Sequence, residues 1–267
     1  MRQFVSAVAP NSKGLLEITG KDFHYLRKVL RLAAGDMVSL SLPGGFSQDA
    51  TVCKIDDGAK KMALQVCATP RNDKHSSQAQ DSAASRTRLA LLQFIPKPQK
   101  MELIVRQATE CGVSAIVPVI GEYTQAGCEK ALQKPDRFEK IIREARQQSG
   151  SQVETKIFQP QKLEAALDLI DGIEPDSLKL FLYERTDGTV SFKDTLLDQG
   201  QNRSQAQDAA AARPCVYAVG SEGGISPGEC GLLLSRGFKA VHFNTNILRC
   251  ETASLYAAAA IQSALDN

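Results

Sequence analysis

The sequence is poor in the residues that build metal centres, disulfide-linked scaffolds and membrane spans. Its seven cysteines are scattered without a Cys-x-x-Cys pair, and it has only three histidines. This pattern argues against a metal site and a disulfide framework, and it predicts a chain with reduced thiols in the cytoplasm. No apolar run approaches the roughly 18 residues of a membrane span. The first residues also lack the apolar core of a signal peptide, so we expect no membrane contact.

The chain also has little net charge. Its formal charge is +2 at pH 7, so any affinity for nucleic acid must come from a local basic patch. Apolar residues make up 43% of the chain and charged residues 23%, which is typical of a soluble protein with a sizeable core. A length of 267 residues is enough for two ordinary domains.

Residues 1–70 are expected to form a small β-barrel, because short strand-like runs alternate with turn residues in this part of the chain. The candidate strands lie at 4–5, 15–18, 37–40, 50–53 and 62–66. One helix, predicted over 22–32 with Asp22 as its cap, interrupts them. The polar residues that follow, 71–87, predict a flexible linker between this domain and a second one at 88–267.

The predicted helix at 22–32 carries a cluster of basic residues. His24, Arg27, Lys28 and Arg31 follow the i, i+3, i+4, i+7 spacing of one helix face. No acidic residue on that face stands at i+4 spacing to pair with them. Clustered cations without partners repel one another unless a polyanion binds, which favours an RNA-binding face over the alternative of a solvated one.

From residue 88 onward the pattern alternates between strands and helices, which predicts an α/β domain with a mainly parallel sheet. Strands are expected at 89–95, 114–120 and 178–183, and helices at 98–111, 135–149 and 161–170. In such a sheet, ligands bind beyond the carboxyl ends of the strands.

Two strands near the end of the chain are each followed by a loop. The strand at 216–219 leads into a glycine-rich turn at 220–224 and then into a helix that Ser226, Pro227 and Glu229 are expected to begin as a capping box. The strand at 240–243 leads into a loop and a last helix at 254–265, whose small residues at 257–260 would allow close helix approach. The glycine-rich turn fits neither a dinucleotide fingerprint nor a phosphate loop.

Residues 220–224 and 246–253 together resemble the C-terminal signature of the SPOUT methyltransferases, and most of all the RsmE family, which methylates N3 of a uridine in 16S ribosomal RNA of the small ribosomal subunit. Residues 100–103, 108–113 and 148–150 are similar to further segments of that family in the same order. The resemblance implies a SPOUT-type α/β knot with a C-terminal trefoil knot, which is a rare exception to the usual connection rules, and an N-terminal PUA-like barrel that binds RNA. It also implies a homodimer without a DNA partner.

The cofactor implied by the resemblance is S-adenosylmethionine (SAM). The residues expected to bind it are Tyr183, Val219, Gly220, Gly223, Gly224, Phe243, Asn246, Ile247 and Leu248. Arg249 is expected to stabilise a uracil anion, and Glu251 to hold Arg249 or accept the N3 proton. The alternative for these two is a structural ion pair. A C5-methylation mechanism would need an activated thiol, and an extended backbone would turn Cys250 away from Arg249 and Glu251.

Four positions depart from the RsmE pattern. Ser221 stands in place of a proline, whereas Tyr123, Ser151 and Asn246 stand in place of arginines. Two further readings stay open. One is 2′-O-ribose methylation of RNA, which other SPOUT families perform. The other is a non-catalytic RNA-binding or ribosome-assembly factor, which the missing cations suggest.

Overall fold

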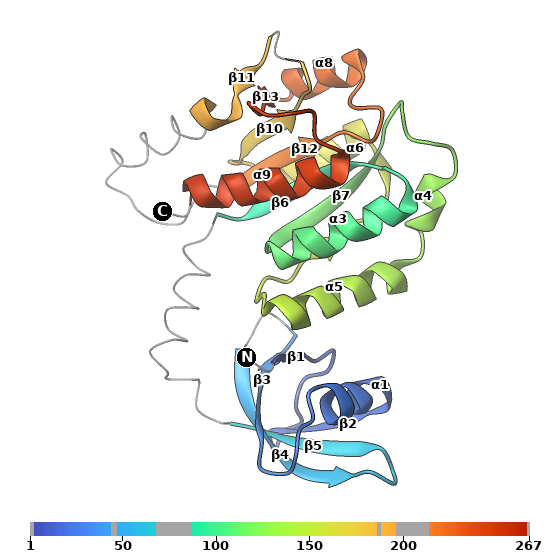
Figure 1. Ribbon diagram of the computed structural model, residues 1–267, viewed down its shortest axis with the longest axis vertical. Helices are drawn as coiled ribbons and strands as arrows, with labels where there is room; N and C mark the ends of the chain where they lie inside the picture. Colours follow the sequence, from blue (N-terminus) through green and yellow to red (C-terminus); the bar gives the residue numbers. More distant parts are fainter. Residues whose placement is uncertain (1–2, 44–46, 68–86, 186–187, 196–213, 266–267) are drawn as a thin grey trace. The chain divides into compact units, whose positions relative to one another are not determined.

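The computed structural model describes residues 3–43, 47–67, 87–185, 188–195 and 214–265. The chain forms two compact units, the first holding Met1–Ala83 and Arg146–Glu154, the second Ala84–Ala145 and Thr155–Asn267. The predicted linker at 71–87 lies almost entirely outside the described ranges, so its flexibility stays a prediction. No helix in those ranges is long and apolar enough to cross a membrane. Figure 1 shows the elements of both units.

The first unit is built on a five-stranded sheet with the order β1-β3-β4-β5-β2. The strands are β1 (Gln3–Val5), β2 (Leu15–Thr19), β3 (Met37–Ser41), β4 (Ser47–Asp56) and β5 (Lys61–Val66). All neighbours pair antiparallel except β1 and β3. The five predicted strands are therefore confirmed, and β4 extends beyond its predicted range at both ends. No pairing joins β1 to β2 among the residues described, so closure into a barrel stays a prediction.

The helix of the first unit is less regular than its sequence pattern. It comprises α1 (Gly20–His24), with Thr19 rather than Asp22 at the N-cap, and a π-helical turn η1 (Tyr25–Val29). In this turn the Leu30 amide donates to the carbonyl oxygen of Tyr25, five residues back, at 3.0 Å. A π turn changes the angular spacing of side chains. Because Arg31 also follows the helix, with φ of 56°, the prediction of four basic residues on one regular helix face is wrong.

The second unit is built on an eight-stranded parallel sheet. Its strands are β6 (Leu89–Phe94), β7 (Val113–Ile120), β8 (Lys156–Ile157), β9 (Gln161–Lys162), β10 (Leu178–Leu182), β11 (Val190–Ser191), β12 (Cys215–Val219) and β13 (Lys239–His242). The order is β11-β13-β10-β12-β6-β7-β8, and β9 also pairs with β7. Every pairing is parallel, which confirms the predicted α/β class.

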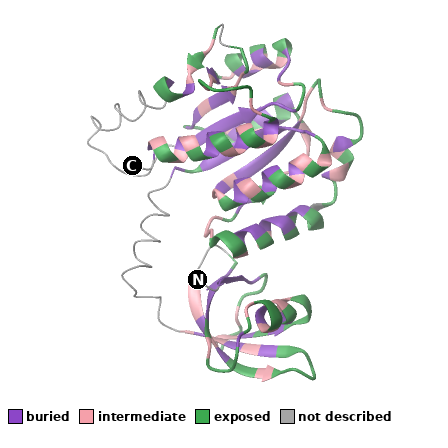
Figure 2. Ribbon diagram, in the orientation of Figure 1, coloured by how far each residue is buried: buried purple, intermediate pink, exposed green. Residues whose placement is uncertain are grey.

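Helices cover both faces of the parallel sheet, as Figure 1 shows. The first face is covered by α3 (Pro98–Glu110), α5 (Pro135–Ser149) and α9 (Cys250–Leu265), the second by α6 (Leu163–Ile173) and α8 (Pro227–Ser235). The short helix α4 (Cys128–Ala131) precedes α5. Along β6, Leu91 packs into the core under α3 and α9, whereas Leu92 packs into the core under α6 and α8. Both faces of the central strands are therefore covered, and Figure 2 shows these strands, β6 and β12 among them, as buried.

The last helix differs from its prediction in two ways. It begins at Cys250 rather than at residue 254, so Cys250 and Glu251 lie in its first turn. The backbone at Cys250 is thus helical, and the expectation of an extended segment there is wrong. Ala257, Ala258 and Ile261 are fully buried in the core of their own unit. Ala257 and Ala258 therefore pack inside their own unit, whereas Ala259 is exposed, so close helix approach at 257–260 stays a prediction.

Candidate active site

A pocket of about 430 Å³ lies beyond the carboxyl ends of three neighbouring parallel strands, β13, β10 and β12. Residues that end or follow each strand line it, at 182–184, 219–225 and 241–249, apart from Gly223 and Asn244. Lys100 of α3 and the first turn of α9 complete the wall. The volume falls within the roughly 300–1,000 Å³ of small-molecule sites, and the location is the one that open α/β sheets use for ligands.

The turn at 220–224, which we call the glycine turn, closes tightly on itself. The Gly224 amide donates to the Ser221 carbonyl oxygen at 3.1 Å, and the Gly223 amide to Ser221 Oγ at 3.4 Å. A Cβ atom on Gly220 would lie 2.7 Å from the carbonyl carbon of Gly224, and Gly224 itself has φ of 80°. Glycine is therefore required at 220 by space and at 224 by conformation. The Ser221 hydroxyl, at a position where proline was expected, supports the turn.

Hydrogen bonds hold the chain on both sides of the glycine turn. Gln93, fully buried on β6, directs Nε2 to the carbonyl oxygens of Val219 and Gly220 at 3.2 Å each. At the other end the predicted capping box is confirmed, since Ser226 Oγ accepts from the Glu229 amide and Glu229 Oε2 accepts from the Ser226 amide. The second carboxylate oxygen of Glu229 accepts from the Glu122 amide at 2.7 Å.

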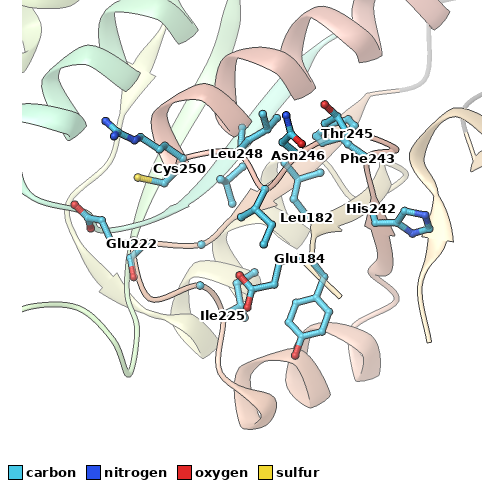
Figure 3. A pocket seen from close by; sticks show the side chains of 18 of the residues that line it. Leu182, Glu184, Glu222, Ile225, His242, Phe243, Thr245, Asn246, Leu248 and Cys250 are labelled. Atoms are coloured by element: carbon cyan, nitrogen blue, oxygen red, sulfur yellow. The ribbon is translucent and has the colours of Figure 1, made fainter. Parts of the chain in front are cut away.

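The opposite wall of the pocket is the loop after β13. Its tip is open, because the Ile247 side chain is 81% exposed. Phe243 at its base packs edge-on against Tyr256 of α9, with ring centroids 4.7 Å apart. In Figure 3, Phe243, Thr245, Asn246 and Leu248 lie along this loop. The loop therefore offers apolar side chains and backbone hydrogen-bonding groups to a ligand.

The structure brings most of the predicted site residues together. The lining includes Tyr183, Val219, Gly220, Gly224, Phe243, Asn246, Ile247, Leu248 and Arg249. Gly223 lies outside the lining, and a Cβ atom there would be 2.8 Å from the Tyr123 Cβ atom. The Tyr183 ring packs toward the core under α6 and α8, edge-on to Phe181. Glu251 is also outside the lining and lies behind the wall.

Glu251 takes part in an ionic cluster that the sequence did not predict. Lys100 Nζ lies 3.3 Å from Glu222 Oε1 and 3.4 Å from Glu251 Oε2. Cys250 Sγ lies 3.2 Å from Glu251 Oε2. Within the described part of the chain Glu251 contacts these groups and forms no ion pair with Arg249. The expected Arg249–Glu251 pair is therefore wrong, because the helical start of α9 directs Glu251 toward α3.

The cluster changes the acidity of two of its members. Burial works to raise the pKa of Glu251, but hydrogen bonds from its own backbone, Cys250 and Lys100 hold it below its usual value. Burial, together with the neighbouring Glu251 carboxylate, raises the pKa of the Cys250 thiol to about 12. At neutral pH the cluster therefore holds an ionised carboxylate beside a protonated thiol.

Four charged or ionisable side chains of the lining were not among the predicted site residues: Lys100, Glu184, Glu222 and His242. Figure 3 shows the Glu184 carboxylate extending into the pocket, with Glu222 and Cys250 at one end and His242 at the other. Glu184 and His242 follow or end parallel strands, so the strand-end rule could have found them. Lys100 belongs to the segment 100–103 that resembles the RsmE family, but the spacing of the residues around it does not indicate that it lines the pocket.

Among the predicted RNA-binding residues of the first unit, Arg27 is already bonded within the unit, whereas the other three are exposed. Arg27 Nε and Nη2 donate to the two carboxylate oxygens of Asp57 at 3.0 and 3.1 Å, and Nη1 donates to the Leu32 carbonyl oxygen at 3.1 Å. The expectation that no acidic residue pairs with this cluster is wrong, because Asp57 follows β4 and lies outside the helix. His24, Lys28 and Arg31 are exposed.

Comparisons with known proteins agree with this geometry. Residues 83–262 match the RNA methyltransferase domain family. The chain is 32% identical over 196 residues to the ribosomal RNA small subunit methyltransferase E of Aquifex aeolicus, which covers 71% of this chain and 77% of that protein. It is 27% identical over 262 residues to the Synechocystis protein of the same name, covering 97% and 77%.

Solved structures with the same fold include a ribosomal RNA small subunit methyltransferase E from Neisseria gonorrhoeae bound to S-adenosyl methionine. It has a TM-score of 0.72 and 22% identity, covering 98% of this chain and 97% of the other. A putative methyltransferase from Legionella pneumophila, in complex with SAM, has a TM-score of 0.71 and 22% identity over the same shares.

Proposed function

Because the chain belongs to the RNA methyltransferase domain family, and within it to the ribosomal RNA small subunit methyltransferase E proteins, we propose that it methylates N3 of a uridine in 16S ribosomal RNA with SAM as the methyl donor. The observation that carries this proposal is the pocket at the ends of β13, β10 and β12, closed by a turn that requires glycine.

The lining residues fit SAM. Leu182, Ile225 and Leu248 offer apolar walls suited to an adenine ring, and the backbone at 219–224 and 243–248 offers hydrogen-bonding groups for its edge. Glu184 and Glu222 place carboxylates beside these walls, which suits a ligand that carries positive charge. When bound, SAM supplies a methyl group already activated on a sulfonium, so the protein needs to align and not to activate the donor.

The acceptor nitrogen must lose its proton. Arg249 lines the pocket with an exposed side chain, where its guanidinium can stabilise a uracil anion. Glu251 is a poor proton acceptor, because a general base works best with a pKa near the operating pH and this carboxyl is held below its usual value. We therefore assign Glu251 to positioning.

The chemistry of Cys250 favours nitrogen over carbon as the acceptor. A C5-methylation mechanism begins with attack by a thiolate, and the Cys250 thiol has a pKa of about 12. Burial and the Glu251 carboxylate, which lies 3.2 Å from Sγ, are the causes of this raised pKa. The thiol is therefore held in its unreactive form.

The proposal also includes a C-terminal knot, a homodimer and a PUA-like RNA-binding domain. The strand order, in which β12 lies between β10 and β6 and β13 on the far side of β10, supports a threaded C-terminal knot. Exposed Ile247 and Tyr256, both near the pocket, support a homodimer that covers this end of α9. The five-stranded sheet of the first unit with exposed His24, Lys28 and Arg31 supports a PUA-like RNA-binding role. A ribosomal RNA substrate also supports a cytoplasmic location for the reaction.

The test is a methylation reaction with the purified protein, SAM and small ribosomal subunits that lack the modification. The RNA is digested to nucleosides, which are separated and identified by mass spectrometry. We expect N3-methyluridine. A 2′-O-methyl nucleoside would identify a ribose methyltransferase instead, and RNA binding without SAM binding in calorimetry would identify a non-catalytic factor.

A further inference from the structure

We infer that Lys100 is a positioning residue. Its ion pairs with Glu222 and Glu251 hold the glycine turn and the start of α9 together, and so fix the separation of two walls of the pocket. The inference rests on the proposed function, because the pocket is taken as the SAM site. Lys100 lies in the first turn of α3, outside both of the loops that it joins.

The contacts of Lys100 come from two segments that are separate in the sequence. Glu222 lies within the glycine turn after β12, and Glu251 lies in the first turn of α9. Lys100 Nζ is 3.3 Å from the first carboxylate and 3.4 Å from the second. The Lys97 amide also donates to Glu222 Oε1 at 3.3 Å, so the start of α3 holds Glu222 through backbone and side chain together.

The burial of the cluster makes these contacts stronger than ordinary surface pairs. The side chains of Lys100, Glu222 and Glu251 are only 28%, 29% and 14% exposed. Pairs at fully exposed positions contribute little because water and salt screen them. Here the removal of the ammonium would leave two carboxylates in a half-buried site with no shared counter-charge, and their repulsion would drive the glycine turn and α9 apart.

The two ion pairs of Lys100 therefore affect both SAM binding and turnover. The glycine turn supplies backbone groups to the ligand, so its displacement lowers affinity for SAM. Arg249 stands two residues before Glu251, so displacement of the first turn of α9 also moves the guanidinium away from the acceptor base. A loss of Lys100 should therefore raise the dissociation constant for SAM and lower kcat at saturating SAM.

The closing experiment compares variants of the full chain by calorimetry with SAM and by methylation of small ribosomal subunits. Lys100→Met removes the charge and keeps much of the side-chain length, and Lys100→Arg keeps the charge. Arg106→Met is the matched control, because it removes an exposed cation from the same helix outside the pocket lining. Thermal unfolding verifies that each variant is folded.

We expect the wild-type protein and Arg106→Met to bind SAM equally, and Lys100→Met to bind about 10-fold more weakly, a factor that corresponds to 1.4 kcal/mol. Lys100→Arg should restore most of the affinity. In a Lys100→Met background, Glu222→Gln should have a smaller effect than in the wild type, because the two residues act as one pair.

Failure of the proposed function and failure of the inference about Lys100 give different results. If the wild-type protein does not bind SAM, the proposed function fails. If the wild type binds SAM while a folded Lys100→Met variant keeps the affinity and kcat of Arg106→Met, the inferred positioning role of Lys100 is wrong. If Lys100→Met fails to fold, additivity of Glu222→Gln with the milder Lys100→Gln variant overturns the inference in its place.

Discussion

Gln93 Nε2 donates to the carbonyl oxygen of Gly220 across 3.2 Å, although the two residues are 127 positions apart in the chain. This hydrogen bond ties a central, fully buried strand to the turn that forms one wall of the pocket. The shape of the candidate SAM site is therefore set from inside the core.

Gln93→Leu should destabilise the protein and weaken SAM binding. The change keeps the approximate size of the side chain but leaves the Val219 and Gly220 carbonyl oxygens without this buried donor. An unsatisfied buried group costs about 1–3 kcal/mol. Chemical denaturation measures the stability, and calorimetry measures the affinity for SAM. A folded variant with wild-type affinity would show that the glycine turn holds its shape without Gln93.

Gly220→Ala should abolish SAM binding while the second unit stays folded. The new Cβ atom would be 2.7 Å from the backbone of Gly224, so the turn must open. Gly172→Ala in α6 is a matched control, since no atom lies within 4 Å of its added Cβ. Calorimetry on both variants checks the prediction, and equal affinities in the two would contradict it.

Arg249→Ala should lower kcat by about 10²–10³, the usual cost of removing one group that stabilises transition-state charge. Its side chain is exposed, so the melting temperature should not change. Cys250→Ser should keep its activity because the thiol has no covalent role in the proposed reaction. Single-turnover methylation measures both rates. An inactive but folded Cys250→Ser variant would point to a thiol mechanism.

The ionic cluster should make the stability of the protein decrease as the pH falls through the acid range. The pKa of Glu251 is lower in the folded state than in the unfolded chain, so its contribution is fully present above the unfolded value of about 4.3 and is lost as pH falls through the folded value. Thermal unfolding between pH 3 and 7 should show a smaller decrease for Glu251→Gln than for the wild type. Parallel curves for the two proteins would contradict this assignment.

Lys28→Ala combined with Arg31→Gly should flatten the salt dependence of RNA binding by about two phosphate contacts, or roughly 0.7–0.9 in slope for each. Glycine at 31 removes the charge and accommodates the positive φ of 56°. Arg27→Ala should instead destabilise the first unit with little change in slope, because its guanidinium already binds Asp57 and Leu32. Filter binding at several salt concentrations decides between the two roles.

Local patterns in the sequence were sufficient for much of the fold. The capping box at Ser226 was correct because its contacts span only three residues. The position of the pocket followed from the rule that ligands bind at the ends of parallel strands, and that rule depends only on the alternation of strands and helices.

The errors occurred where a distant part of the chain decides the outcome. Arg27 looked unpaired because Asp57 is 30 positions away and reaches it only when β4 folds beside the helix. The helix α9 begins at Cys250, earlier than predicted, and Glu251 in its first turn pairs with Lys100 of α3, which is distant in the sequence. The contacts of Lys100 with Glu222 and Glu251 could not be predicted from local patterns, because both carboxylates lie on distant segments of the chain.

The strand order determines when, during synthesis of the chain, the pocket can form. The central strand β6 pairs with β12, and Gln93 reaches Val219 across 126 positions. Such long-range parallel pairing forms slowly, because the chain must close a large loop before the contact stabilises it. A ribosome that has made β6 must still produce the residues through Ala253 before the pocket is complete. The nascent chain therefore cannot bind the methyl donor, and competence begins only when its last helix emerges.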